Sequence, residues 1–241
     1  MCREIYFPVL TNPSIYSESR LLAGFSFMGL RPAELCSALR LLAGFLFLKC
    51  CVIVPRYFIV YKPFNVLSQF TSSEGRPVLK DFFSVPDDVY PVGRLDFDSE
   101  GLLLLTNDKQ LNHRLLNPQF AHEREYWVQV DGAIDDAALQ MLRSGVTINL
   151  DGKPYTTRPC LAEKFDSPPE VPQRNPPIRY RAHIPTSWIK MILQEGKNRQ
   201  VRKMTAKTGF PTLRLIRYRL GKVSLDGLQP GGMREITNFP L

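Results

Sequence analysis

GRLDFDSEGLLLLTND, residues 93–108, sets three carboxylates directly in front of four consecutive leucines. A short, unbroken apolar run that ends in the turn pair Asn107–Asp108 is typical of a fully buried strand. The run therefore predicts a strand in the protein core. The three acids lie where the chain enters that core, so each of them needs a structural or a chemical role.

The three acids differ in what their neighbours allow. Asp98, Ser99 and Glu100 suit a tight connection, because short polar side chains accept hydrogen bonds from nearby backbone N–H groups. Asp96 instead ends a brief strand, VYPVGRL at 89–95, and a strand end is a rigid base for a nucleophile or a general base. A glycosidase-like pair of carboxylates is the alternative, but acids so close in sequence seldom face each other across a substrate.

Strand and helix patterns alternate along the rest of the chain. Alternating or β-branched segments predict strands at 57–62, 125–132, 187–196 and 211–225, short strands about the turn at 151–152, and a last strand after 231–232. Helices are predicted within 72–83 and at 109–117, 134–145 and 198–209, the last capped by Asn198 and ended by Gly209. Residues 166–185 carry six prolines and predict an irregular connecting or substrate-facing loop. Together the elements predict an α+β domain around a mixed, mainly antiparallel sheet.

The composition narrows the class of partner. The 241 residues carry a formal charge of +8, which favours nucleic acid, an anionic membrane surface or a phosphorylated ligand. The five cysteines and three histidines have no metal or disulfide spacing, so we expect a reducing compartment and no metal site. No apolar run approaches the ~20 residues of a membrane-spanning helix.

One segment concentrates the positive charge. Residues 195–222 hold nine Lys or Arg residues and one acidic residue. A solvated helix face is the alternative reading, but the charges run through a predicted helix and then a predicted strand. The segment therefore predicts contact with nucleic-acid phosphates. Tyr126, Trp127 and Tyr218 are aromatic side chains suited to stacking on an unpaired base.

The first 55 residues differ from the rest of the chain. RLLAGFSF at 20–27 returns as RLLAGFLF at 40–47, and a single duplication is too short for a solenoid. We expect residues 1–55 to lie outside the folded core. They could be an amphipathic appendage, an organelle transit sequence, or a stretch translated from upstream of the true start. The folded domain is predicted to span 56–241.

Four motifs, PVGRLDFDSEGLLLLTND, EYWVQV, EGKNRQVRKM and LRLIRYRLG, resemble in this order those of the RsuA-type pseudouridine synthases. With RNPPIR, IPTSW and GFPTLRLIRY, the chain is similar to the subgroup of ribosomal large subunit pseudouridine synthase E. The resemblance spans about residues 57–237. It implies the pseudouridine synthase catalytic fold without an S4-like RNA-binding domain.

The resemblance also implies roles for individual residues. Asp96 matches the aspartate nucleophile that acts on a uridine, whose base then detaches, rotates and reattaches through C5. Tyr126 matches the tyrosine that stacks on the base and takes part in proton transfer, and Arg202 the basic residue that pairs with the aspartate. Such a pairing suits the chemistry, because a carboxylate in a dry pocket needs a cationic partner to stay ionised. The remaining predicted site residues are Leu215 in the pocket wall, Lys62, Pro63, Asp98 and Ser99 in structural support, and Arg94, Lys197, Asn198, Arg199 and Arg217 in substrate binding.

The implied function is the isomerisation of a specific uridine in 23S-type large-subunit ribosomal RNA, without a cofactor. Two alternatives stay open: a ribosome-assembly RNA-binding protein without turnover, and the same reaction on another RNA. The expected partner is ribosomal RNA, alone or in an assembling ribosomal particle. We expect a monomer without membrane attachment, in the cytoplasm or, if residues 1–55 are a transit sequence, in an organelle.

Overall fold

The leucine run forms strand β3 (Glu100–Thr106), in which every residue is buried. The computed structural model describes residues 54–72, 74–178 and 184–240. β3 pairs antiparallel with β1 (Tyr57–Lys62) and parallel with β9 (Thr212–Leu220). Its alternate leucines enter two different apolar clusters, one on each face of the sheet. This burial on both faces explains why the strand has no polar alternation.

The main sheet has nine strands in the order β11-β1-β3-β9-β4-β8-β7, with β10 beside β9 and β2 beside β3. Within the described residues, its strands pair antiparallel except β3 with β9. The prediction of a mixed, mainly antiparallel sheet is confirmed. The remaining strands are β2 (Tyr90–Pro91), β4 (Arg124–Asp131), β7 (Leu161–Lys164), β8 (Thr186–Leu193), β10 (Val223–Ser224) and β11 (Met233–Ile236).

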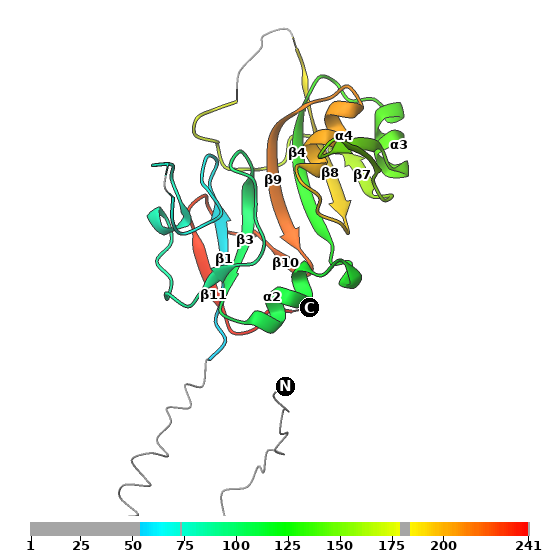
Figure 1. Cartoon of the computed structure of the whole chain (residues 1–241). Coiled ribbons are helices and arrows are strands. Elements are labelled where there is room, and N and C mark those ends of the chain that lie inside the picture. The colour runs from blue at the N-terminus through cyan, green and yellow to red at the C-terminus, as the bar shows by residue number, and fades with distance from the viewer. Residues whose placement is uncertain (1–53, 73, 179–183, 241) are drawn as a thin grey trace, which may run out of the picture. The chain divides into compact units, whose positions relative to one another are not determined.

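Helices α3 (Asp136–Ser144) and α4 (Gln200–Lys207) lie together beside β7 and β8 (Figure 1). One apolar cluster joins Leu142 of α3 and Met204 of α4 to Val128 of β4. This burial fixes α4 against the sheet, and with it the loop that precedes α4. The other helical segments are α2 (Lys109–Leu116) and single 3₁₀ turns at Leu79–Asp81 and Pro118–Phe120.

A separate hairpin stands outside the main sheet. Its strands are β5 (Thr147–Leu150) and β6 (Lys153–Thr156), and the chain turns at Asp151 and Gly152 with positive φ, as the Asp-Gly pair predicts. The hairpin contacts α4. It therefore lies next to the loop that carries the basic residues 197–199.

Two predicted strands need correction, and one further strand was not predicted. The strand predicted at 211–225 is two strands, because the chain reverses at Gly221 (φ 56°) and β10 pairs back onto β9. The strand predicted at 89–95 shrinks to Tyr90–Pro91, because Gly93 (φ 68°) turns the chain. β7 was not predicted separately from the strands of the hairpin, and its four residues are too few for a clear alternation.

The start of α4 is also corrected. Its N-cap is Arg199, in the left-handed conformation at φ 52°, and no side chain caps the helix. The predicted cap, Asn198, is exposed one residue earlier. The end is as predicted, with Gly209 at positive φ just after the helix.

Two predicted segments fall wholly or partly outside the described residues. Of residues 1–55, only Val54 and Pro55 are described. The described parts of the proline-rich segment, 166–178 and 184–185, are irregular as predicted. Among the described helices, none is long and apolar enough to cross a membrane.

The two halves of the main sheet meet where β3 and β9 begin their parallel contact. There Glu100 pairs with Ile216 and Gly101 with Arg217. Gly101 has φ 111°, and a Cβ at this position would lie 2.4 Å from the backbone oxygen of Arg217. Only glycine permits this approach, so the junction requires a residue without a side chain at position 101.

Gly101→Ala should therefore lower the free energy of unfolding by about 3 kcal/mol or more, from backbone strain plus the clash. Gly152→Ala is the matched control, because Gly152 also has positive φ (84°) but has no atom within 4 Å of the added Cβ. Its expected loss is about 1 kcal/mol. Urea unfolding of both variants measures the difference, and equal losses would show that the close approach is unimportant.

Candidate active site

A cleft of about 510 Å³ opens beside the junction of the two sheet halves. Its walls come from the turn between β2 and β3, from β4 and β9, and from the loop before α4. Nine of the predicted site residues line it: Arg94, Asp96, Ser99, Tyr126, Lys197, Asn198, Arg199, Leu215 and Arg217. Of the other predicted site residues, Lys62, Pro63, Asp98 and Arg202 do not line it. The fold thus brings together residues that lie more than a hundred positions apart in the sequence.

Hydrogen bonds fix the backbone on both sides of Asp96. The Ser68 hydroxyl bonds both the N–H and the C=O of Leu95, at 3.0 and 2.8 Å. After Asp96 the chain turns, and the Ser99 N–H donates to the Asp96 carbonyl at 3.0 Å. The carboxylate itself is 37% exposed, with the Arg199 guanidinium 3.9 Å away. A rigid backbone therefore supports a reactive group that stays accessible from the cleft.

Asp98, two residues on, takes the strong charge contacts. Arg199 donates to both of its carboxylate oxygens, at 2.9 and 2.8 Å. Arg202 donates to the Asp98 carbonyl at 2.5 Å, and its Nε lies 3.4 Å from the carboxylate. Burial opposes ionisation of Asp98, but the two guanidinium groups outweigh it and hold the pKa of the carboxyl below its usual value.

These contacts correct two predictions. Arg202 was predicted to pair with Asp96, but its ion pair and its hydrogen bond are both with Asp98. Arg199, on the loop before α4, is the cation that comes close to Asp96. Asp98 and Ser99 were predicted to tie down backbone N–H groups; the main contacts of the Asp98 carboxylate are with guanidinium groups, and the buried Ser99 hydroxyl has no hydrogen-bond partner.

Glu100 was also predicted to shape the turn, and Arg214 was counted in the basic RNA-binding segment. The structure pairs them with each other, through hydrogen bonds of 2.9 and 2.8 Å. Their side chains are 2% and 6% exposed. This buried pair ties the first residue of β3 to β9, so neither side chain is available to RNA.

Lys62 lies fully buried at the end of β1. Its ammonium donates to the carbonyls of Pro63 and Val66, at 2.9 and 2.8 Å, and so fixes the turn that follows the strand. Burial lowers its pKa to about 7, although the nearby carboxylates of Glu100, Asp98 and Asp96 act in the opposite direction. Lys62 and Pro63 thus stand behind the cleft, in line with the predicted supporting role.

Tyr126 and Arg217 are cross-strand neighbours on β4 and β9. Arg217 is 5% exposed and donates from Nε to the carbonyl of Leu102 at 2.7 Å, whereas its Nη2 has no hydrogen-bond partner in the protein. Burial lowers the pKa of Arg217, and neighbouring Tyr126 acts in the opposite direction. With Leu215, these side chains form a wall that is apolar except for one phenol and one buried cation.

Four further side chains at the cleft were not among the predicted site residues. Arg124, Tyr155, Arg158 and Glu195 all line the cleft. Tyr155 and Arg158 come from β6 and the segment after it, which no motif marks. Glu195 stands inside the quoted motif EGKNRQVRKM, and an acid in so basic a segment is the signal that could have drawn attention to it.

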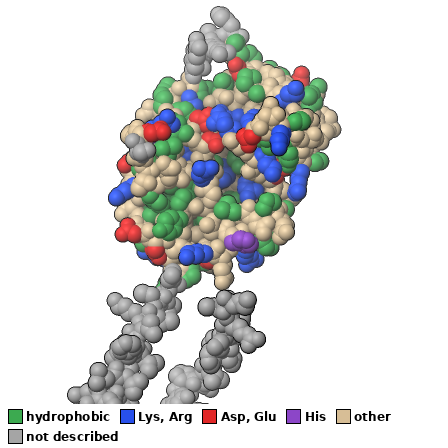
Figure 2. Space-filling view, viewed as in Figure 1, with side chains coloured by type: hydrophobic (Ala, Val, Ile, Leu, Met, Phe, Trp, Pro, Cys, Tyr) green, Lys and Arg blue, Asp and Glu red, His purple; other side chains and the backbone are tan. Residues whose placement is uncertain are grey.

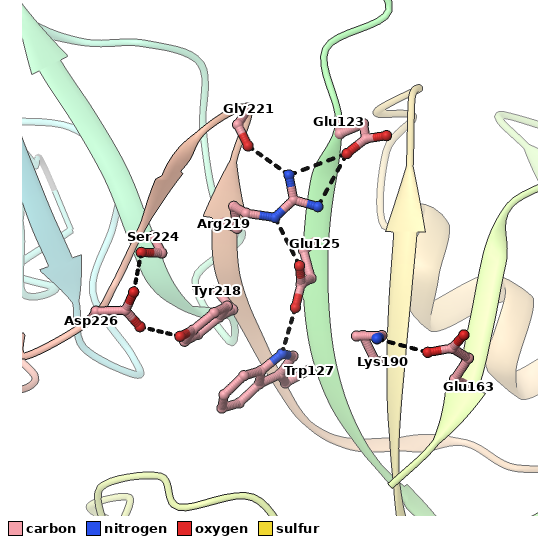
Figure 3. A network of polar contacts seen from close by, with 10 residues as sticks. All are labelled: Glu123, Glu125, Trp127, Glu163, Lys190, Tyr218, Arg219, Gly221, Ser224 and Asp226. Carbon is pink, nitrogen blue, oxygen red and sulfur yellow. Dashed lines mark hydrogen bonds and ion pairs between the residues drawn. The ribbon is translucent and has the colours of Figure 1, made fainter. Parts of the chain in front are cut away.

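Two of the predicted stacking residues, Trp127 and Tyr218, lie on the face of the sheet away from the cleft. Trp127 and Tyr218 stack on each other, with ring centroids 3.9 Å apart, and neither lines the cleft. Arg219 is held by Glu123 and Glu125, and Lys190 by Glu163 (Figure 3). Trp127, Tyr218 and Arg219 therefore hold β4 to β9, outside the cleft.

Other basic side chains remain at the surface. Lys197 and Arg199 are exposed at the cleft, as are Arg94 and Asn198. Figure 2 shows Lys and Arg side chains gathered over the central part of one face of the molecule. Within the part of the chain that the structure describes, no three His, Cys, Asp or Glu side chains lie together so as to hold a metal ion.

The lowered pKa of Lys62 predicts a pH-dependent stability. The folded protein favours the neutral amine above about pH 7, whereas an unfolded chain keeps the proton up to the usual value of 10.5. Between these values the unfolded state binds more protons, so the stability contributed at this position should rise with pH, by about 1 kcal/mol per pH unit.

The measurement is urea unfolding of the wild type and of Lys62→Met at several pH values from 7 to 10. The stability of the wild type minus that of the variant should increase through this range. Lys80→Met, which removes an exposed lysine, is measured in parallel. If the stability difference between the wild type and Lys62→Met does not change with pH, the lowered pKa of Lys62 is contradicted.

Comparison with known proteins places these observations in a family. The family model described as RNA pseudouridylate synthase matches residues 56–207. A Vibrio parahaemolyticus protein named ribosomal large subunit pseudouridine synthase E is 51% identical over 175 residues, covering 73% of this chain and 71% of the relative. A protein of the same name from Xanthomonas axonopodis pv. citri is 48% identical over 171 residues, covering 70% and 87%.

A solved structure, entitled crystal structure of pseudouridylate synthase, superposes with a TM-score of 0.62 at 26% identity, over 76% of this chain and 70% of that one. The predicted pseudouridine synthase fold and the resemblance to the E subgroup are thus confirmed. The chain belongs to the RNA pseudouridylate synthase family.

Proposed function

We propose that this protein converts a specific uridine of large-subunit ribosomal RNA to pseudouridine, with Asp96 as the nucleophile. The observation that carries the proposal is the convergence of Asp96, Tyr126, Leu215 and Arg217 on one cleft. The names of its relatives, ribosomal large subunit pseudouridine synthase E, support the ribosomal substrate.

The reaction is an isomerisation, so the cleft has to break one bond and form another without adding or removing atoms. The bond from C1′ to N1 breaks, the base turns, and a bond from C1′ to C5 forms. A proton leaves C5, and N1 gains one. Asp96 is suited to the nucleophilic step because its carboxylate is accessible, its backbone is fixed, and the Arg199 cation lies 3.9 Å away.

Tyr126, Arg217 and Leu215 suit the base itself. The tyrosine ring and the leucine offer flat and apolar contact to a pyrimidine, which favours its removal from water. Arg217 lines the cleft beside Tyr126, and uracil carries carbonyl oxygens that a guanidinium can bind. The Tyr126 hydroxyl, next to Arg217, is the group that we assign to proton transfer at C5.

The exposed basic side chains suit the RNA backbone. A uridine inside a helix has to be turned out before C1′ and C5 can be reached, at a cost of a few kcal/mol. Phosphate contacts from Arg94 and Lys197 at the rim of the cleft offset that cost. Asn198 adds an uncharged donor in the same loop.

Further expectations complete the proposal. We assign catalysis to a domain of residues 56–241. We also predict that the protein is a monomer and that it works in the cytoplasm. Its predicted substrate is free ribosomal RNA or an assembling ribosomal particle.

Asp96→Asn should abolish pseudouridine formation, by at least about 1000-fold, and leave RNA affinity nearly unchanged, because the amide keeps the shape but not the nucleophile. Asp98→Asn, in the same turn, should cost only about tenfold, because it disturbs the position of Arg199 and not the nucleophile. Single-turnover assays on ribosomal RNA and RNA-binding titrations measure both quantities. Product from the Asp96→Asn protein would overturn the assignment.

Mapping of pseudouridines in ribosomal RNA from cells with and without the gene identifies the target uridine. An RNA-binding protein without turnover predicts identical maps. A change confined to another RNA would keep the chemistry and replace the substrate.

Tyr126→Phe keeps the ring and removes the hydroxyl. If the hydroxyl transfers the proton, the rate of the chemical step should fall by roughly 100-fold to 1000-fold while RNA affinity stays the same. The comparison uses the same single-turnover assay. A change of less than about threefold would assign Tyr126 to stacking alone.

A further inference from the structure

Glu195 is a buried carboxylate near the start of the loop that leads from β8 to α4. It is 9% exposed and accepts three hydrogen bonds, two from residues 155–158 and one from α4. The donors are the Tyr155 hydroxyl at 2.6 Å, the Arg158 backbone N–H at 2.9 Å, and the Gln200 side-chain amide at 2.5 Å. Glu195 therefore joins the β5–β6 hairpin to the first residue of α4.

Gln200 extends this connection back to the loop. Its side chain is 4% exposed, and its Oε1 accepts the backbone N–H of Lys197 at 2.9 Å. The Gln200 N–H also donates to the Lys197 carbonyl at 3.1 Å. Together the contacts close a ring around residues 196–199 and fix the conformation of that loop from inside the protein.

The loop needs such support because of Arg199. This residue has φ 52°, a left-handed conformation that residues other than glycine rarely adopt, and no side chain caps the helix that follows. In this conformation the guanidinium binds Asp98 and lies 3.9 Å from the carboxylate of Asp96. The direction in which the Arg199 guanidinium points thus depends on a backbone conformation that an arginine rarely adopts.

We propose that Glu195 is a positioning residue: through Gln200 it holds the loop 196–199 so that Arg199 faces the carboxylates of Asp96 and Asp98. The proposal rests on the proposed function, because it assigns to Arg199 a role beside the nucleophile. A carboxylate fits the position because it has only acceptors, and three donors converge on it. Glutamine can keep the two contacts at one oxygen and donate to the Tyr155 hydroxyl, which also accepts.

Four variants test the proposal: Glu195→Ala, Glu195→Gln, Tyr155→Phe and the control Glu163→Ala. Glu163 lies on β7, pairs with Lys190 at 2.7 Å and is 50% exposed, away from the cleft (Figure 3). The single-turnover rate of Glu195→Ala should fall by about 10-fold to 100-fold, since a displacement of about 1 Å near the reacting groups has that effect. Glu195→Gln and Tyr155→Phe should lose less than about fivefold, and Glu163→Ala nothing.

A double-mutant cycle identifies the route of the effect. In an Arg199→Ala background, Glu195→Ala should cost less than about threefold, because residues that act through one contact are not additive. RNA affinity of Glu195→Ala should fall by a smaller factor than its single-turnover rate does. Equal losses in both backgrounds, or a loss that only matches the fraction of unfolded protein, would overturn the proposal.

Hydrogen exchange gives a readout that does not depend on activity. The backbone amides of residues 196–200 should exchange faster in Glu195→Ala, and to a lesser degree in Tyr155→Phe, than in the wild type or in Glu163→Ala. Unchanged exchange would contradict the positioning role even if the wild type is fully active. A wild type that forms no pseudouridine would instead refute the proposed function, while the exchange comparison still decides the role of Glu195. Tyr155→Phe carries the same comparison if Glu195→Ala does not fold.

Discussion

The parallel contact of β3 with β9 is the constraint on which the rest of the structure depends. It joins one half of the sheet, which leads into the turn with Asp96, to the other half, which carries Leu215 and Arg217. The contact is possible because Gly101 has no side chain, and it is secured by the buried pair of Glu100 and Arg214. Removing one partner of a buried pair leaves an uncompensated charge, so such a junction tolerates little change.

Around this junction, the basic and acidic residues divide into separate tasks that the net charge does not reveal. Arg214 pairs with a buried glutamate and Arg219 with two glutamates nearer the surface, and both hold strands together. Arg217 is buried in the cleft wall, where its Nε binds the carbonyl of Leu102. Lys197 and Arg199 stay exposed. The number of Lys and Arg residues in a basic segment is therefore a poor guide to the number of RNA contacts. The register of the strands decides which of these side chains form ion pairs with Asp or Glu in the protein.

Much of the fold followed from local pattern. The leucine run, the alternation of β4 and the Asp-Gly turn of the hairpin each reflect a short-range preference, and each was confirmed. The motifs also identified the family. What the sequence did not reveal was the pairing of Arg202 with Asp98, the left-handed Arg199 and the wall with Tyr155. These depend on where distant loops meet, and no periodicity or spacing records such meetings.

The stack of Trp127 on Tyr218 has a consequence for how RNA is selected. It binds β4 to β9 on the face opposite Tyr126 and Arg217, so the cleft is braced from behind. A braced cleft adapts little to its ligand, and the distortion needed for binding then falls on the nucleic acid. A uridine in weakly stacked, easily bent surroundings therefore costs less to turn out into such a cleft than one in a stiff helix.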